Sequence, residues 1–127
     1  MKRSSILRFQ SAYYGLTGVW PLISIETFER ITGPKLERWL VRTVGAVVGV
    51  QGAGFWIAAH EREATRSTAV IAAGSALALG AIDGVYVAKR RISPVYLVDA
   101  VIQSVFVVAW LTALREGRRP RLEAPPA

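Results

Sequence analysis

The chain has 127 residues, of which 52% are hydrophobic, and its formal net charge is +7. It contains no cysteine and a single histidine, which excludes disulfides, thiolate metal sites and cysteine nucleophiles, and leaves too few ligands for a typical zinc or haem site. No helix-turn-helix, RNA-binding signature or aromatic-interleaved basic patch accompanies the positive charge, so we expect no cofactor and no nucleic-acid partner.

Four apolar stretches predict four membrane-spanning helices, since each is near the length of about 20 residues that a spanning helix needs. They cover about residues 9–25, 39–59, 67–88 and 94–114. A soluble bundle would carry a polar stripe on each helix, but the stretch from Val44 to Ala59 has only Gln51 as a polar side chain. We therefore predict an all-α, four-helix transmembrane bundle that forms one domain over residues 1–115. The basic, Pro-rich tail, 116–127, is expected to be disordered.

The connections between the stretches contain helix start signals. From Glu26 to Arg38 apolar residues recur at helical spacing among charged ones, which predicts a short interfacial helix or a continuation of the first span. Pro34 is expected to be the first residue of the second span. Ser93 is expected to be the N-cap of the fourth span, with Pro94 as its first residue.

The distribution of Lys and Arg suggests an orientation in the membrane. The end that carries both termini has nine basic residues, and the opposite end has seven. This small bias favours a multi-pass protein of the bacterial inner membrane with both termini in the cytoplasm. Aromatic side chains are expected at headgroup level near the cytoplasmic ends (Tyr13, Tyr14, Trp56, Trp110) and near the opposite ends (Trp39, Tyr86, Tyr96).

Small residues recur at a spacing of four in the second and third spans. They are Gly45, Gly49 and Ala53, then Ala72, Ala76, Gly80 and Gly84. Because such stripes let two helix backbones approach closely in lipid, we expect these spans to pack through them. Whether the contact forms within one chain or in a homodimer stays open.

Two aspartates are placed symmetrically about a basic turn. The pattern is Asp83-x-x-Tyr86, then Lys89-Arg90-Arg91, then Tyr96-x-x-Asp99. An antiparallel helix pair would bring both carboxylates to the same depth, where acidic side chains are costly and usually have a partner or a function. Glu26 and Arg42 fall within about two helical turns of the same face.

These residues predict a polar layer. Its candidate members are Asp83, Asp99, Arg42, Glu26, Tyr86, Tyr96 and Gln103. Three interpretations stay open: a salt-bridged lock in which Arg42 neutralises an aspartate, a pocket for a cation, a proton or a polar lipid headgroup, and side chains that merely reach for the surface.

Six short motifs extend over most of the chain apart from the tail. They are Tyr13-Tyr14-Gly15-Leu16-Thr17-Gly18-Val19-Trp20-Pro21-Leu22, Thr32-Gly33-Pro34-Lys35, Trp39-Leu40-Val41, Thr43-Val44-Gly45, Ile82-Asp83-x-x-Tyr86 and Tyr96-Leu97-x-Asp99-Ala100. Together they resemble a family of small bacterial membrane proteins. The resemblance implies four spans and adds no activity, because none is assigned to the family.

Three functions are compatible with this pattern. The first is a non-enzymatic accessory subunit or lipid- or ligand-binding module, with Asp83 and Asp99 lining its pocket and Arg42 as counter-ion. The second is a proton-coupled transporter of small cations, which is suggested by the excess of acidic over basic residues in the polar layer. The third is a membrane enzyme on lipid-like substrates, with the aspartates as acid and base. The expected partner is the lipid bilayer, and a larger membrane complex or a homodimer stays open.

Overall fold

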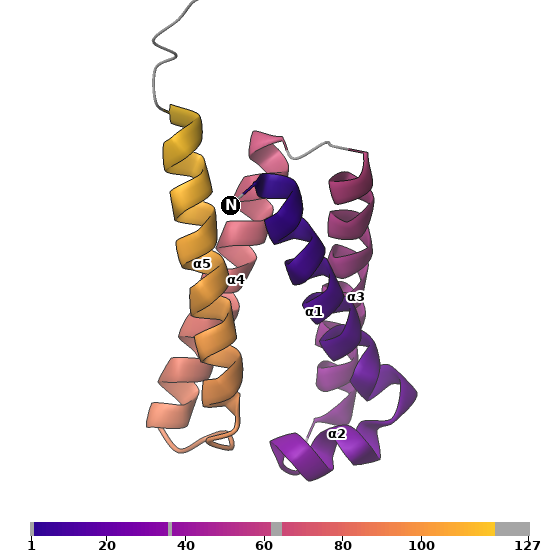
Figure 1. The fold of residues 1–127 in the computed structure, drawn as a ribbon. Coiled ribbons are helices and arrows are strands. Elements are labelled where there is room, and N and C mark those ends of the chain that lie inside the picture. The colour runs from indigo at the N-terminus through magenta and orange to yellow at the C-terminus, as the bar shows by residue number, and fades with distance from the viewer. Residues whose placement is uncertain (1, 36, 62–64, 119–127) are drawn as a thin grey trace, which may run out of the picture.

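The computed structural model describes residues 2–35, 37–61 and 65–118, and within them the chain forms five helices and no strand. The helices are α1 (Arg3–Ile23), α2 (Ile25–Thr32), α3 (Arg38–His60), α4 (Arg66–Ala88) and α5 (Tyr96–Arg118) (Figure 1). The all-α class is thus confirmed, and the long helices lie close to the four apolar stretches. Helix α5 includes the first three residues of the tail that was expected to be disordered, and the remaining tail residues lie outside the described part.

The short helix between the first two long ones is confirmed as a separate element. Ser24 begins α2, because its side-chain oxygen accepts a hydrogen bond from the backbone N–H of Thr27 at 3.4 Å. Gly33 ends it with a φ of +96°, a conformation that side chains disfavour. The expectation for Pro34 is wrong, since α3 begins only at Arg38.

The start of the last helix follows the predicted logic with a small shift. Ser93 Oγ accepts the backbone N–H of Val95 at 3.3 Å, as an N-cap does. The regular helix begins at Tyr96, two residues later than expected, because the first N–H groups bond to carbonyls three residues back. Such a tight first turn is common at helix ends.

The long helices form two antiparallel pairs. Helix α1 packs along α3, and α4 packs along α5, while α1 also reaches across to α5 and α4 through a smaller interface. Figure 1 shows the pairs side by side, with the beginning of α1 and the end of α5 at the same end of the molecule. Helix α1 therefore joins the two pairs.

Glycines bring the backbones of α1 and α3 into contact. A Cβ atom added at Gly18 would lie 2.5 Å from Gly49 N, and one at Gly45 would lie 2.6 Å from Gly18 O. One added at Gly52 would lie 2.6 Å from Gly15 N. No real side chain fits at such distances, so these positions require glycine for close approach.

The prediction that the second and third spans pack through small residues is therefore wrong. The stripe on α3 faces α1, because α1 offers its own small surface at Gly15 and Gly18, and α3 and α4 touch only marginally. On α4, Ala72 and Ala76 are fully buried, and a Cβ at Gly80 would meet Gln103 of α5 at 3.2 Å. Ala53 is exposed, and a Cβ at Gly84 would meet nothing within 4 Å, so these two take no part in packing.

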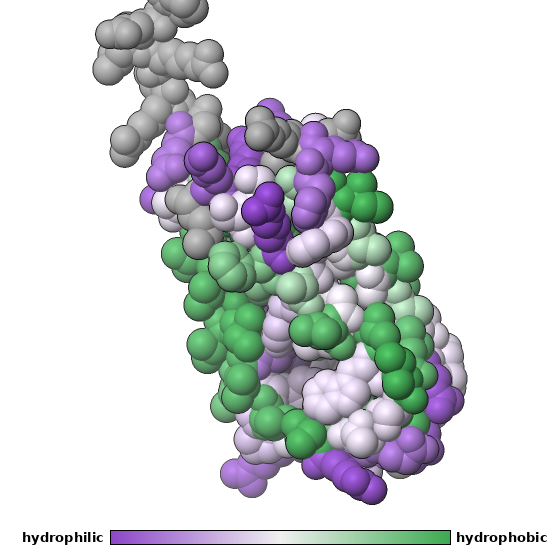
Figure 2. Space-filling model, turned by 45° about the vertical axis from the view of Figure 1, so that its right-hand side comes forward, coloured by the Kyte–Doolittle hydropathy of each residue, from purple (hydrophilic) through white to green (hydrophobic). Residues whose placement is uncertain are grey.

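Three helices are long and apolar enough to cross a membrane: Arg38–His60, Arg66–Ala88 and Tyr96–Glu116. Their outward side chains are largely apolar, and Figure 2 shows hydrophobic residues over the middle of the surface with hydrophilic residues at both ends. Such a surface indicates a membrane protein. Helix α1 is not among the three, and its polar residues Gln10 and Ser11 are buried against its neighbours.

Candidate functional site

A row of polar and aromatic side chains fills the interface between α1 and the α4–α5 pair. We call it the polar seam; its members are Gln10, Tyr13 and Tyr14 of α1, Asp83 of α4, and Asp99, Gln103 and Trp110 of α5. Along α5 the seam residues are spaced by four and seven positions, which keeps them on one helix face. The seam runs lengthwise between the two helix pairs.

The two aspartates meet at one end of the seam, as the symmetric sequence pattern predicted. The carboxyl group of Asp99 is the ionisable neighbour of Asp83, and the hydroxyl of Tyr13 donates a hydrogen bond to Asp99 Oδ1. Gln103 Nε2 donates to the same oxygen at 3.3 Å. Asp99 is thus held by side chains of α1 and α5.

Asp83 is held less completely. Its side chain is only 7% exposed, and its Oδ2 atom is the one buried side-chain polar atom without a hydrogen-bond partner in the part of the chain that the structure describes. Buried polar groups almost always have a partner, and an exception needs an explanation. The unpartnered Oδ2 atom of Asp83 therefore marks this end of the seam as the candidate site.

The middle of the seam is fully hydrogen-bonded. The hydroxyl of Tyr14 donates to Gln103 Oε1 at 2.9 Å, so that Gln103 uses both ends of its amide. Gln103 is 2% exposed and belongs to the predicted layer, one turn beyond Asp99. Its predicted place beside Asp99 is confirmed.

The other end of the seam centres on Gln10, which has no exposed surface. Its Nε2 atom donates to the carbonyl oxygen of Ala72 at 2.9 Å, and its Oε1 atom accepts from Trp110 Nε1 at 2.7 Å. One amide of α1 thereby binds α4 and α5 at once. In a low-dielectric interior such satisfied groups specify the relative position of the helices.

Aromatic rings pack around the two tyrosines of the seam. Phe106 lies with its ring centroid 6.0 Å from that of Tyr13 and 6.4 Å from that of Tyr14. Phe55 of α3 lies 6.0 Å from Tyr14. Within these distances aromatic pairs attract one another, so the rings form a packed wall.

Four predicted members of the layer lie outside the seam. Arg42 and Glu26 are exposed, and neither aspartate forms an ion pair with a described residue, so the expected salt bridge to Arg42 is wrong. Arg42 belongs to α3, which pairs with α1 and not with the hairpin that carries the aspartates. Tyr86 is 43% exposed, with Lys89 Nζ 5.8 Å from its ring centre, and Tyr96 stacks under Lys35 Nζ at 4.8 Å.

Sequence reasoning missed four of the seven seam residues, namely Gln10, Tyr13, Tyr14 and Trp110. Tyr13, Tyr14 and Trp110 were expected at headgroup level, but Tyr14 and Trp110 are buried and Tyr13 is half-buried, because each polar ring atom finds a partner inside the bundle. A signal was present: Gln10, Tyr13, Tyr14 and Thr17 recur at helical spacing along the first stretch.

A scan against protein-family models found no match, and neither did searches of curated proteins and of solved structures. The resemblance to a family of small membrane proteins rests on sequence motifs alone. Among the described residues, no group of three or more His, Cys, Asp or Glu side chains could hold a metal ion. What the site offers chemically is a pair of neighbouring carboxyl groups, tyrosine hydroxyls and aromatic faces.

Proposed function

We propose that this protein is a small integral membrane protein that binds a cationic group at Asp83 and Asp99, as a ligand-binding module or accessory subunit. The observation that supports the proposal best is the buried, unpartnered Oδ2 atom of Asp83 beside a second carboxyl group. A buried carboxylate is strongly disfavoured unless it is paired, and two neighbouring ones repel each other. A bound cation relieves both costs.

The surroundings of the two carboxyl groups favour an organic cation. Tyr13, whose hydroxyl bonds Asp99, packs its ring against those of Tyr14 and Phe106, and aromatic rings attract ammonium groups through their negative faces. The hydrogen bonds of Tyr13 and Gln103 hold Asp99 in place, so that little order has to be created on binding.

In this proposal four helices cross the membrane and α1 is the fourth. Its polar residues Gln10 and Ser11 are buried against the other helices, which supports a crossing segment of lower hydropathy. Because α1, α3, α4 and α5 alternate in direction, the start of α1 and the end of α5 lie on the same side of the bundle. The small excess of Lys and Arg on that side favours the cytoplasmic face of a bacterial inner membrane.

The test is binding of butylammonium to the purified protein in detergent, measured by calorimetry for the wild type, Asp83→Asn and Glu26→Gln. Asn has nearly the same shape as Asp but carries no charge, and we expect Asp83→Asn to weaken binding at least about tenfold. Glu26 is exposed and lies outside the seam, so Glu26→Gln should bind like the wild type. Equal affinity of all three proteins would exclude the proposed site.

A second candidate is a proton-coupled transporter of small cations. It is favoured by the small interface through which α1 contacts α4 and α5, compared with the interfaces within the two helix pairs. Two pairs that pack separately and share a partly polar interface can rock against each other. Vesicles with the reconstituted protein should then take up a small cation when a pH gradient is imposed, and Asp83→Asn and Asp99→Asn should abolish the uptake. Binding without flux would leave the module as the function.

A further inference from the structure

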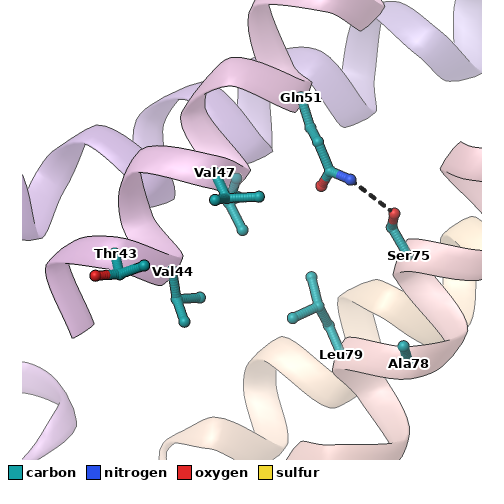
Figure 3. Close-up of a pocket in the computed structure, with 8 residues that line it drawn as sticks. Thr43, Val44, Val47, Gln51, Ser75, Ala78 and Leu79 are labelled. Carbon is teal, nitrogen blue, oxygen red and sulfur yellow. Dashed lines mark hydrogen bonds between the residues drawn. The ribbon is translucent and has the colours of Figure 1, made fainter. Parts of the chain in front are cut away.

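An apolar groove lies between α3 and α4, on the side where the two helix pairs diverge. Its volume is about 310 Å³, and valines and a leucine supply most of its walls (Figure 3). The residues that line it are Thr43, Val44, Val47, Val48, Gln51, Ser75, Ala78 and Leu79. Gln51 Nε2 donates to Ser75 Oγ at 3.2 Å and thereby bridges the two helices at one end.

The hydroxyl of Thr43 and the Nε2 atom of Gln51 already have partners, whereas the Oε1 atom of Gln51 has no hydrogen bond to a described residue. Thr43 Oγ1 donates to the carbonyl oxygen of Trp39 at 2.8 Å, and Gln51 Nε2 is bonded to Ser75. What remains available to an occupant is a hydrocarbon surface with the Gln51 carbonyl oxygen at one end. Val44 and Val47 are 48% and 56% exposed, so the groove opens toward the surroundings of the helices, which in a membrane are lipid tails.

The groove extends toward the depth of the unpartnered aspartate. Because α3 and α4 run in opposite directions, the Gln51–Ser75 contact places Thr43 level with Asp83, eight residues along each helix. Leu79 lines the groove, and Asp83 follows it by one helical turn, about 6 Å along α4. Asp83 does not itself line the groove, but the end of an extended molecule in it would lie about one helical turn from this residue along α4.

We propose that the ligand of the cationic site is a single-chain amphiphile with a protonated amine, whose hydrocarbon chain occupies the groove and whose ammonium group binds Asp83. This inference rests on the proposed function and adds the class of ligand. The charge of the two aspartates selects an amine over a carboxylate or phosphate head. The volume lies at the lower limit of small-molecule sites, about 300 Å³, which suits one hydrocarbon chain.

The experiment compares dodecylamine, butylamine and dodecanol in phosphatidylcholine nanodiscs that contain the protein. Binding is measured for the wild type, Asp83→Asn, Val47→Trp, which fills the groove, and Val105→Trp. Val105 is 62% exposed on α5, so Val105→Trp makes the same change on a surface outside the groove. We expect Val47→Trp to weaken the binding of dodecylamine at least about tenfold and to leave the binding of butylamine unchanged. Val105→Trp should change neither affinity.

The outcomes separate the two proposals. Unchanged dodecylamine binding in Val47→Trp, or dodecanol binding as tight as that of dodecylamine, would overturn the amphiphile and leave the cationic site intact. Equal binding of both amines by Asp83→Asn and the wild type would overturn the cationic site itself. Unchanged butylamine affinity shows that Val47→Trp keeps the seam folded, and Leu79→Trp from the opposite wall replaces it if that affinity is lost.

Discussion

Helix α1 has two interfaces of opposite character. Toward α3 it presents Gly15 and Gly18, and the two backbones touch with no side chain between them. Toward α4 and α5 it presents Gln10 and the two tyrosines, which meet their partners through hydrogen bonds. The first interface depends on shape, and the second depends on the pairing of particular atoms.

This difference follows from the physics of helix association in lipid. Burial of apolar surface adds little there, so close van der Waals contact and interhelical hydrogen bonds provide the stability. A backbone-to-backbone contact has one arrangement and tolerates no added atom. A hydrogen-bonded seam can exchange one partner for another, which is why the candidate ligand site lies in the second interface.

The largest expected effect is on the glycine interface. Gly18→Ala and Gly52→Ala place a Cβ atom 2.5 to 2.6 Å from backbone nitrogens of the other helix, and neither backbone can move aside without losing contacts along the pair. We expect each to destabilise the protein by about 3 kcal/mol, at the upper end for overpacking. Unfolding in mixed detergent micelles measures the change.

The matched control is Gly54→Ala on the same helix. A Cβ atom at this position meets nothing within 4 Å, and alanine favours a helix over glycine by about 1 kcal/mol. The control should therefore be neutral or slightly stabilising. Destabilisation of the same size in Gly54→Ala and Gly18→Ala would show that the close approach of the backbones is unimportant.

The long helices could be predicted from the sequence because their signal is local. Apolar runs separated by charged or Gly- and Pro-containing segments bound the helices to within a few residues, and the symmetric placement of Asp83 and Asp99 predicted their meeting, because a hairpin fixes which residues share a depth. Ser24 and Ser93 act as caps, a property of neighbouring residues only.

The pairing of the helices could not be predicted in this way. Small residues on α3 show that a close neighbour exists, but not which helix it is, and the neighbour in the sequence, α4, was the wrong choice. The error over Arg42 has the same origin, since charge alone suggested its pairing with the aspartates and the packing separates them. Tyr14 and Trp110 likewise belong to residue types that are common at the membrane interface. They are buried here because their polar atoms bond to Gln103 and Gln10, which are distant in the sequence.

A smaller effect is expected in the seam at Gln10. Gln10→Leu keeps the volume of the side chain but leaves the buried Trp110 N–H without an acceptor and removes the bond to Ala72. An unsatisfied buried donor costs about 1 to 3 kcal/mol, so we expect a loss of about 2 kcal/mol in the same unfolding experiment.

The control for Gln10→Leu is Gln51→Leu. Gln51 makes a single part-buried hydrogen bond, to Ser75, and lies at the groove between α3 and α4. Interhelical hydrogen bonds of this kind contribute about 0.6 kcal/mol on average, so the control should lose less than half as much as Gln10→Leu. Equal losses would mean that the seam is no more specific than an ordinary contact.

The smallest effect is expected for Tyr14→Phe, which removes one hydroxyl and leaves the ring packed against Phe55 and Phe106. Gln103 Oε1 loses its donor at 2.9 Å, and the expected cost is about 1 kcal/mol. Tyr86→Phe is the control: its ring is 43% exposed, and its hydroxyl has no hydrogen bond to a described residue.

Tyr14→Phe should also weaken butylammonium binding, because Gln103 donates to Asp99, but the loss of affinity should be smaller than in Asp83→Asn. A stability loss without any change in binding would show that the middle of the seam only joins the helices, whereas a change in both would show that it also positions the carboxyl groups.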